Sequence, residues 1–203
     1  MKSIECLKNE QLKLAKKVIT KDKFKRIRLI GGCDCAFVKD KVISAIIICD
    51  KDMDIIEKKY SISKIKFPYI PGFLSYREVP SLIMTYKKIK NKPDILICDC
   101  NGILHPRRLG AASHLGVLLN KTTIGVAKSL LLGKIKNNYI YVNNEKRGFR
   151  LKNKNFKAVY ISPGHKILLR TSIKIIKKLF KEHRLPEPLY LAHKYANEVK
   201  CKI

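Results

Sequence analysis

The chain has 203 residues, 46% of them hydrophobic, which is enough for a folded core and excludes a disordered chain. Lys and Arg number 44 against 16 Asp and Glu, a formal net charge of +28, so the simplest partner is a polyanion such as nucleic acid. A lysine-rich composition without a binding role is the alternative. No apolar run approaches the ~18 residues of a membrane helix, which argues against a membrane protein.

Cysteine usage and the first residues indicate the compartment. Seven cysteines, an odd number, and a charged first segment without an apolar stretch predict free thiols in a reducing, cytoplasmic compartment. Two cysteine pairs are C-x-C, at 33–35 and 98–100, and each flanks an aspartate. Neither has the C-x-x-C spacing of structural zinc sites, so we expect no zinc and interpret these cysteines as small apolar residues.

The first half of the chain predicts a helix, a strand meander and a second helix. The helix covers 3–20, with Ser3 as a possible cap, and three strands follow at 28–37, 41–49 and 54–62. A rigid loop with two prolines and a glycine spans 67–72. Helical character then runs over 74–90, interrupted near its start by Pro80.

The second half alternates strands and helices. A short strand at 94–99, DILICD, is apolar enough to be buried on both faces. The remaining predicted elements are a helix at 109–119, a strand at 122–126, further strands within 134–160, and helices at 171–183, capped by Thr171, and at 186–200. This order predicts an α/β fold: a ribonuclease H-like mixed central sheet flanked by helices, in a single domain over residues 1–203.

Two aspartates are candidates for a metal site. Asp34 lies inside RLIGGCDCAF, and Asp99 ends DILICD. A buried carboxylate needs a cation or hydrogen-bond donors nearby, and converging carboxylates on neighbouring strands would suit Mg²⁺. A bound metal ion can activate water and stabilise a phosphoryl transition state. Aspartates that cap turns are an equally good interpretation of the pattern, and Glu78 on a helix means little alone.

Basic residues follow the same strand ends. Arg107 and Arg108 stand at a predicted helix start after Asp99, an arrangement that can bind a phosphate. Lys128 follows the next predicted strand in GVAKS. As isolated features, these three side chains are more often surface charge.

Six segments, in this order and spacing, closely resemble the endonuclease V family: GGCDCAF, FPYIPGFLSYREVP, DILICDCNGILHPRRLGAASHLG, TIGVAKS, ISPGH and LPEPLYLAH. The match runs from about Gly31 to His193. The resemblance implies a ribonuclease H-like fold and a Mg²⁺-dependent endonuclease, with Mn²⁺ as a substitute. It also implies hydrolysis of the second phosphodiester bond 3′ to hypoxanthine, leaving 3′-OH and 5′-phosphate ends, in DNA repair or inosine-RNA processing.

The resemblance assigns roles to individual residues. It implies metal binding by Asp34, Glu78 and Asp99, with Lys128 and His193 as further catalytic residues. It implies a wedge at Tyr69, and nucleic-acid contacts that also include Pro68, Ile70, Pro71, Gly72, Leu74, Gly102, His105, Arg107 and Leu131. A loop anchored by a buried Tyr69 is the alternative. Cys100 departs from the family, which commonly has glycine there, and we expect its Cβ and thiol to narrow the pocket or to alter its hydrogen bonding.

Two other functions are kept as alternatives. One is a related structure-selective or RNA-processing nuclease with the same acids, and the other is a non-catalytic basic nucleic-acid-binding protein. The expected partner is DNA or RNA that contains deoxyinosine or inosine, bound by a monomer. Nothing in the residues decides between DNA and RNA, because that depends on contacts to the 2′-OH.

Overall fold

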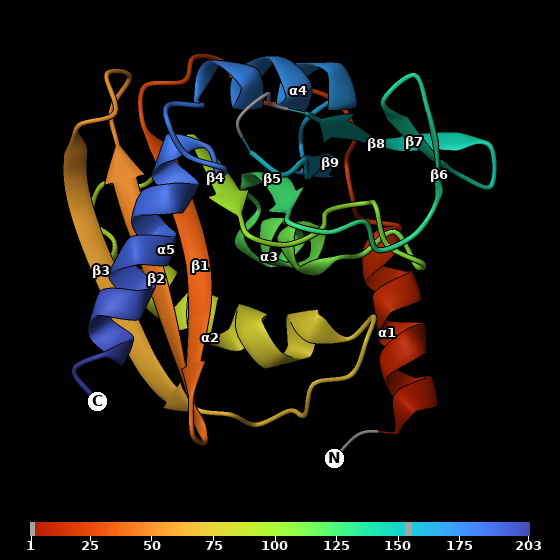
Figure 1. Ribbon diagram of the computed structural model, residues 1–203. Coiled ribbons are helices and arrows are strands. Elements are labelled where there is room, and N and C mark those ends of the chain that lie inside the picture. The colour runs from red at the N-terminus through yellow and green to blue at the C-terminus, as the bar shows by residue number, and fades with distance from the viewer. Residues whose placement is uncertain (1–2, 153–155) are drawn as a thin grey trace.

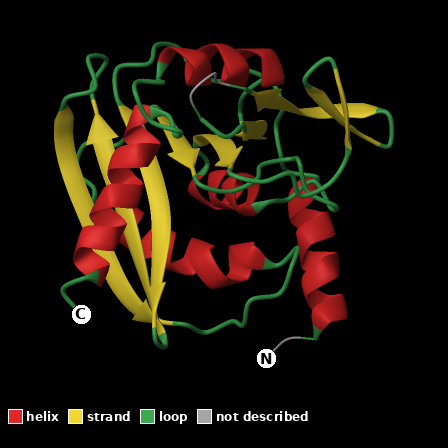
Figure 2. Ribbon diagram, viewed as in Figure 1, coloured by secondary structure: helices red, strands yellow, loops and turns green. Residues whose placement is uncertain are grey.

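The computed structural model describes residues 3–152 and 156–203. Its described strands form one nine-stranded mixed sheet in the order β3-β2-β1-β4-β5-β9-β8-β7-β6, with helices on its faces (Figures 1 and 2). The prediction of an α/β fold with a mixed sheet flanked by helices is confirmed. Within the described ranges no helix is long and apolar enough to cross a membrane.

The helices are α1 (Ile4–Ala15), α2 (Leu74–Lys88), α3 (Ala111–Leu119), α4 (Leu169–Lys178) and α5 (Glu187–Lys200). The strands are β1 (Ile30–Val38), β2 (Lys41–Cys49), β3 (Ile55–Lys64), β4 (Ile95–Cys98), β5 (Thr122–Ala127), β6 (Lys134–Lys136), β7 (Tyr139–Val142), β8 (Glu145–Leu151) and β9 (Val159–His165).

The sheet is buried on both faces at its centre. On one face, α2 and α3 pack a cluster that includes Val79, Leu82 and Leu115 against β1, β2 and β4. On the other face, α4 and α5 supply Ile176 and Leu189 to a second cluster. Figure 1 shows α5 in front of β1 and β2 and α2 behind them. Two-sided burial explains the continuous apolar runs of β2 and β4, since a strand with one wet face would alternate.

The central strands also fix where functional groups emerge. β1, β4 and β5 run parallel, so their carboxyl-terminal ends lie at the same edge of the sheet. Cys33 of β1 is directly opposite Cys98 of β4, and the next residue in each strand is an aspartate. The backbone N–H of Asp99 donates to the carbonyl of Cys33 at 3.2 Å, which continues the pairing by one residue.

Some predicted boundaries are wrong for identifiable reasons. α1 ends at Ala15 and not at residue 20. Thr171 is no helix cap: α4 already begins at Leu169, and the Thr171 hydroxyl donates to Asp22 at 2.8 Å. Asp22 also accepts from the N–H of Leu168, so a distant carboxylate satisfies the helix start.

The predicted strands within 134–160 correspond to β6, β7, β8 and the start of β9, except that residues 153–155 lie outside the described residues. β9 runs on to His165 through Pro163 and Gly164. Its pairing with β5 shifts between Thr123 and Ile124, which are opposite His165 and Pro163. An irregularity of this kind accommodates a proline that a regular ladder would reject.

Adjacent glycines in β1 give a test of this packing. A Cβ on Gly32 would lie 1.9 Å from the Pro188 carbonyl oxygen at the start of α5, so Gly32→Ala forces backbone apart. A Cβ on Gly31 would meet the end of the Leu96 side chain at 2.7 Å, which can turn away. We expect Gly32→Ala to lower the free energy of unfolding by roughly 3 kcal/mol or more and Gly31→Ala by about 1 kcal/mol, measured by urea unfolding. Equal losses would contradict the close approach of α5.

Candidate active site

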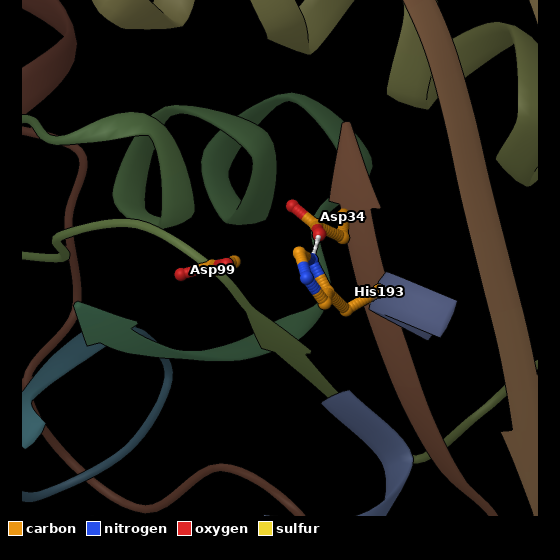
Figure 3. Close-up of side chains that lie close together, drawn as sticks. All are labelled: Asp34, Asp99 and His193. Atoms are coloured by element: carbon orange, nitrogen blue, oxygen red, sulfur yellow. Dashed lines mark hydrogen bonds and ion pairs between the residues drawn. The ribbon is translucent and has the colours of Figure 1, made fainter. Parts of the chain in front are cut away.

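Two aspartates and a histidine meet at the carboxyl-terminal edge of the central strands (Figure 3). Asp34 comes from β1, Asp99 directly follows β4, and His193 comes from α5. One ligand atom from each lies within 4.8 Å of the others. Three residues separated by up to 159 positions therefore form one cluster with oxygen and nitrogen donors.

His193 is held in place by two contacts. Its Nδ1 lies 2.6 Å from Oδ2 of Asp34, and Oδ1 of Asp34 accepts from the N–H of Cys35 at 2.7 Å. One turn along α5, the Asn197 amide donates to the His193 carbonyl at 2.9 Å and lies 3.3 Å from Nε2. The ring is fixed by Asp34, while its side chain stays 41% exposed and so open to a ligand.

Asp99 forms an ion pair with Lys128, which follows β5 at the same edge. Burial raises the pKa of Asp99, the nearby charge of Asp34 raises it further, and Lys128 acts in the opposite direction. The Asp99 carboxylate is therefore a buried anion that needs positive charge beside it. Lys128 supplies that charge from the rim.

Glu78 is a third carboxylate close to Asp34 and Asp99. It lies on α2, and burial together with the charges of Asp34 and Asp99 raises its pKa to about 8, against the opposing effect of Arg77. Its oxygens are not part of the close cluster of Asp34, Asp99 and His193. Glu78 thus stands near the two aspartates but outside the set of converging ligand atoms. The three acids together favour a cation at this edge.

A cavity of about 220 Å³ opens beside Asp99 and Lys128. Of the residues expected at a base pocket, its lining includes Tyr69, Pro71, Gly72, Leu74, His105 and Leu131. Pro68, Ile70, Gly102 and Arg107 are not in the lining. A Cβ on Gly102 would lie 2.0 Å from the Pro163 carbonyl oxygen, and its N–H donates to Ser162. Glycine is needed there because β9 packs against it.

The loop before α2 presents Tyr69 to solvent. Its side chain is 67% exposed, whereas Phe67 and Phe73 on either side are buried with Leu7 of α1. The Tyr76 hydroxyl donates to the Leu7 carbonyl at 3.1 Å, which fixes the loop further. The two phenylalanines therefore anchor the loop, and Tyr69 is no buried anchor.

Arg107 and Arg108 are used inside the protein. Arg107 donates to the Gly72 carbonyl at 2.7 Å and to Gln11 of α1, and its guanidinium lies 4.5 Å from the centre of the Phe73 ring. Arg108 pairs with Glu145 of β8. We predicted an anion site at these arginines; in the structure Nε and Nη2 of Arg107 and Nη1 of Arg108 donate to protein acceptors. Arg107 joins α1, the Tyr69 loop and the turn before α3.

Several residues of the site carry no signal in the sequence. Gln11 is fully buried beneath the Tyr69 loop, where its amide donates to the Gly72 carbonyl at 3.1 Å. Asn197 supports His193, as described above. Ser75 and Asn101 line the cavity, and the Ser75 hydroxyl and the Asn101 side-chain carbonyl lack a hydrogen-bond partner among the described residues. A polar residue in an amphipathic helix or after a strand is usually solvated, so only the fold identifies these.

Comparison with known proteins decides the family. The endonuclease V family profile matches residues 12–194. The chain belongs to the endonuclease V family. It is 43% identical over 198 residues to endonuclease V of Dictyoglomus thermophilum, in an alignment that covers 93% of this chain and 87% of the relative.

Solved structures of endonuclease V agree over the whole chain. The structure from Streptomyces avermitilis superposes with a TM-score of 0.92 at 26% identity, covering 100% of this chain and 95% of that one. Ciona intestinalis endonuclease V, solved with a 24mer DNA containing an inosine followed by a ribo-adenosine, gives 0.89 at 29% identity and 98% coverage of both chains. This member of the family is therefore an enzyme that cleaves nucleic acid.

Cys100 lines the pocket, where we expected its thiol to narrow the space or to alter the hydrogen bonding. Cys100 is 7% exposed and belongs to the apolar cluster with Cys33 and Cys98. The thiol thus packs partly into the core, beside the cavity wall.

Two buried histidines predict how stability depends on pH. Burial lowers the pKa of His105 and of His114 to about 4, against an ordinary value near 6.5. Between pH 6.5 and 4 the unfolded chain binds protons that the folded chain does not, so stability is full above this window and falls as the pH falls. Each histidine contributes a slope of ~1.4 kcal/mol per pH unit there. Urea unfolding from pH 7 to 4.5 should show a flatter profile for His105→Gln/His114→Gln than for wild type; an identical profile would assign the slope to other groups.

Proposed function

We propose that this member of the endonuclease V family recognises hypoxanthine in a nucleic-acid strand and hydrolyses the second phosphodiester bond on its 3′ side. The observation that carries the proposal is the cavity of about 220 Å³, whose lining includes Asp99 of the acid cluster and Lys128, the ion-pair partner of Asp99. When a base is held in this cavity, the sugar-phosphate backbone next to it would lie close to the carboxylates. The role would be DNA repair or the processing of inosine-containing RNA.

We assign a divalent cation, Mg²⁺ with Mn²⁺ as a substitute, to Asp34 and Asp99, with Glu78 nearby. The donor set fits, because hard carboxylate oxygens are what Mg²⁺ prefers and because buried like charges need a counter-charge. When bound, such an ion supplies an activated water molecule and stabilises charge on the phosphoryl group. His193, whose ring is held by Asp34, would serve as a further ligand of the metal ion or as a proton donor.

Lys128 would serve the scissile phosphate. Its ammonium already sits beside Asp99 at the mouth of the cavity, and its side chain is 36% exposed. The ammonium would place a positive charge next to the phosphate oxygens on which negative charge develops during hydrolysis. The pairing with Asp99 keeps the ammonium in this place before substrate arrives.

The cavity would read the base mainly through its shape and its polar wall. The pKa of His105 is lowered to about 4 by burial, so its ring is neutral at pH 7. Nδ1 faces the N–H of Arg107 at 3.2 Å and Nε2 the Gly72 carbonyl at 3.0 Å, so Nε2 carries the proton and both nitrogens are engaged. His105 thus shapes the wall. The unpartnered polar atoms of Ser75 and Asn101 are left to meet a purine edge.

A relative supports the choice of substrate. The Ciona intestinalis protein was solved on inosine-containing DNA, and its fold covers 98% of this chain. Hypoxanthine differs from adenine by a carbonyl at C6 and a protonated N1, so a polar cavity wall can distinguish them. No observation favours a structure-selective nuclease or a non-catalytic binding protein over this substrate.

Matched strands with and without one inosine test the proposal. Wild type with Mg²⁺ should cut the inosine strand alone, at the second bond on the 3′ side, and EDTA should abolish cutting. Asp99→Asn should reduce cleavage by at least about 10³-fold, because it removes one of the converging carboxylates, with little change in strand affinity. End mapping on denaturing gels and fluorescence anisotropy measure the two effects. Equal cutting of both strands would point to a structure-selective nuclease, and full turnover by Asp99→Asn would exclude this acid cluster as the catalytic centre.

The exposed ring of Tyr69 makes a second prediction. If it stacks in the gap left by an extracted base, Tyr69→Ala should weaken affinity for the inosine strand by about 1–3 kcal/mol, and for an undamaged strand by less. Tyr69→Phe should be nearly neutral because the ring face remains. Anisotropy titrations in EDTA give both values. A severe Phe variant beside a mild Ala variant would assign the role to the hydroxyl instead.

A further inference from the structure

β6, β7 and β8 form an antiparallel end of the sheet whose outer face carries lysines and aromatic rings. Two cross-strand rows share this face: Lys134–Tyr141–Lys146 and Lys136–Tyr139–Phe149. Directly paired residues point to the same side of a sheet. The six side chains therefore form one surface, which we name the hairpin face.

The packing of the neighbouring residues establishes which side is outside. Ile140, between the two tyrosines, is fully buried, and Ile135, between the two lysines, is half-buried. The three lysines of the hairpin face are exposed, and its two tyrosines are half-buried. The face is hollowed, and the lining of the hollow contains the three lysines, the two tyrosines, Asn137 and Asn144.

Charge and rings lie together in this hollow. The Lys146 ammonium is 4.3 Å from the centre of the Tyr139 ring and 5.8 Å from that of Tyr141. Among the residues that the structure describes, no carboxylate comes within ion-pair distance of Lys134, Lys136 or Lys146. Glu145, the acid of this hairpin, pairs with Arg108 and Arg147. The combination of unpaired positive charge with aromatic rings fits a nucleic-acid strand, in which phosphates alternate with bases.

The strands that carry the hairpin face are joined to the base cavity by the chain and by contacts made from their other side. Leu131 lines the cavity, and β6 begins at Lys134, three residues further along. Arg147 donates to the His105 carbonyl at 3.1 Å, and Glu145 holds Arg108, so the hairpin is tied to the cavity wall. In the sheet order, β6 to β8 are at one end and the acid-bearing β1 and β4 are central, with the hairpin on the far side of β5 (Figure 1).

We propose that the hairpin face binds the unpaired strand on the 5′ side of the base held in the cavity. The inference rests on the proposed function, because a cut on the 3′ side places the 3′ strand at the acids and leaves the 5′ strand to the far side. Tyr139 and Tyr141 offer rings for bases, and the three lysines neutralise phosphates. The chemistry is shared by DNA and RNA.

Strands of graded length test this inference without catalysis. A short inosine strand is extended by about four nucleotides on the 5′ side or on the 3′ side, as DNA and as RNA, and affinity is measured in EDTA. Wild type should gain roughly tenfold from the 5′ extension in both chemistries, from stacking and phosphate contacts. Lys134→Gln/Lys136→Gln should lose most of this gain, and its log–log salt slope should fall by about 1.4, for two phosphates at ~0.7 each.

The control changes the same charge elsewhere. Lys25 and Arg26 are exposed in the loop before β1, at the sheet edge opposite to the acids, and Lys25→Gln/Arg26→Gln should retain the 5′ gain. Tyr141→Ala should also lose most of the gain, because it removes a ring on which a base stacks, and Tyr141→Phe should restore it. Thermal melting of each variant separates loss of binding from loss of folding.

The outcomes distinguish this inference from the proposed function. If wild type does not prefer inosine over adenine, the proposed function fails. If it prefers inosine but gains nothing from the 5′ extension, or gains equally from the 3′ extension through Lys134 and Lys136, only the hairpin proposal is overturned. An equal loss of the 5′ gain in the Lys25→Gln/Arg26→Gln control would also overturn it, because the effect would then be general charge.

Discussion

The structure is organised around two largely buried carboxylates, those of Asp34 and Asp99, which lie side by side. Parallel pairing of β1 with β4 sets Cys33 opposite Cys98, so Asp34, in the middle of β1, lies next to Asp99, which directly follows β4. In a low dielectric, each negative charge makes it less favourable to ionise the other. Burial and these charges raise the pKa of Asp99, and they raise the pKa of Glu78 to about 8. His193 and Lys128 each contact one of the aspartates, from α5 and from the end of β5.

The surroundings of this cluster are rigid because internal contacts hold them. Gly32 lets α5 approach β1 closely enough to deliver His193. On the other side, the Gly72 carbonyl accepts from Gln11 and from Arg107 and lies 3.0 Å from Nε2 of His105, so one backbone group joins α1, the Tyr69 loop and the turn before α3. A loop held this tightly can present an exposed ring with little loss of entropy on binding.

What the net charge of +28 can bind depends on where the charged side chains lie. Arg107 donates to Gly72 and Gln11, and Arg108 pairs with Glu145, so part of each guanidinium is engaged within the protein. Among the described residues no carboxylate pairs with the lysines of the hairpin face, and their first strand begins three residues after Leu131 of the cavity lining. Charge that is fixed in rows next to a reaction centre can guide a strand, whereas charge spread evenly would only raise non-specific affinity.

The sequence by itself determined the α/β class, the buried strands and the positions of Asp34 and Asp99, because apolar runs and residues at strand ends are local features. The motif blocks also determined the family. Only the tertiary structure decided that Arg107 binds Gln11, 96 residues away, that Gly102 lies beneath β9 and outside the cavity lining, and that Asn197 supports a histidine bonded to Asp34. Local pattern carries no information about which distant segment will pack against a residue, and these roles follow from that packing.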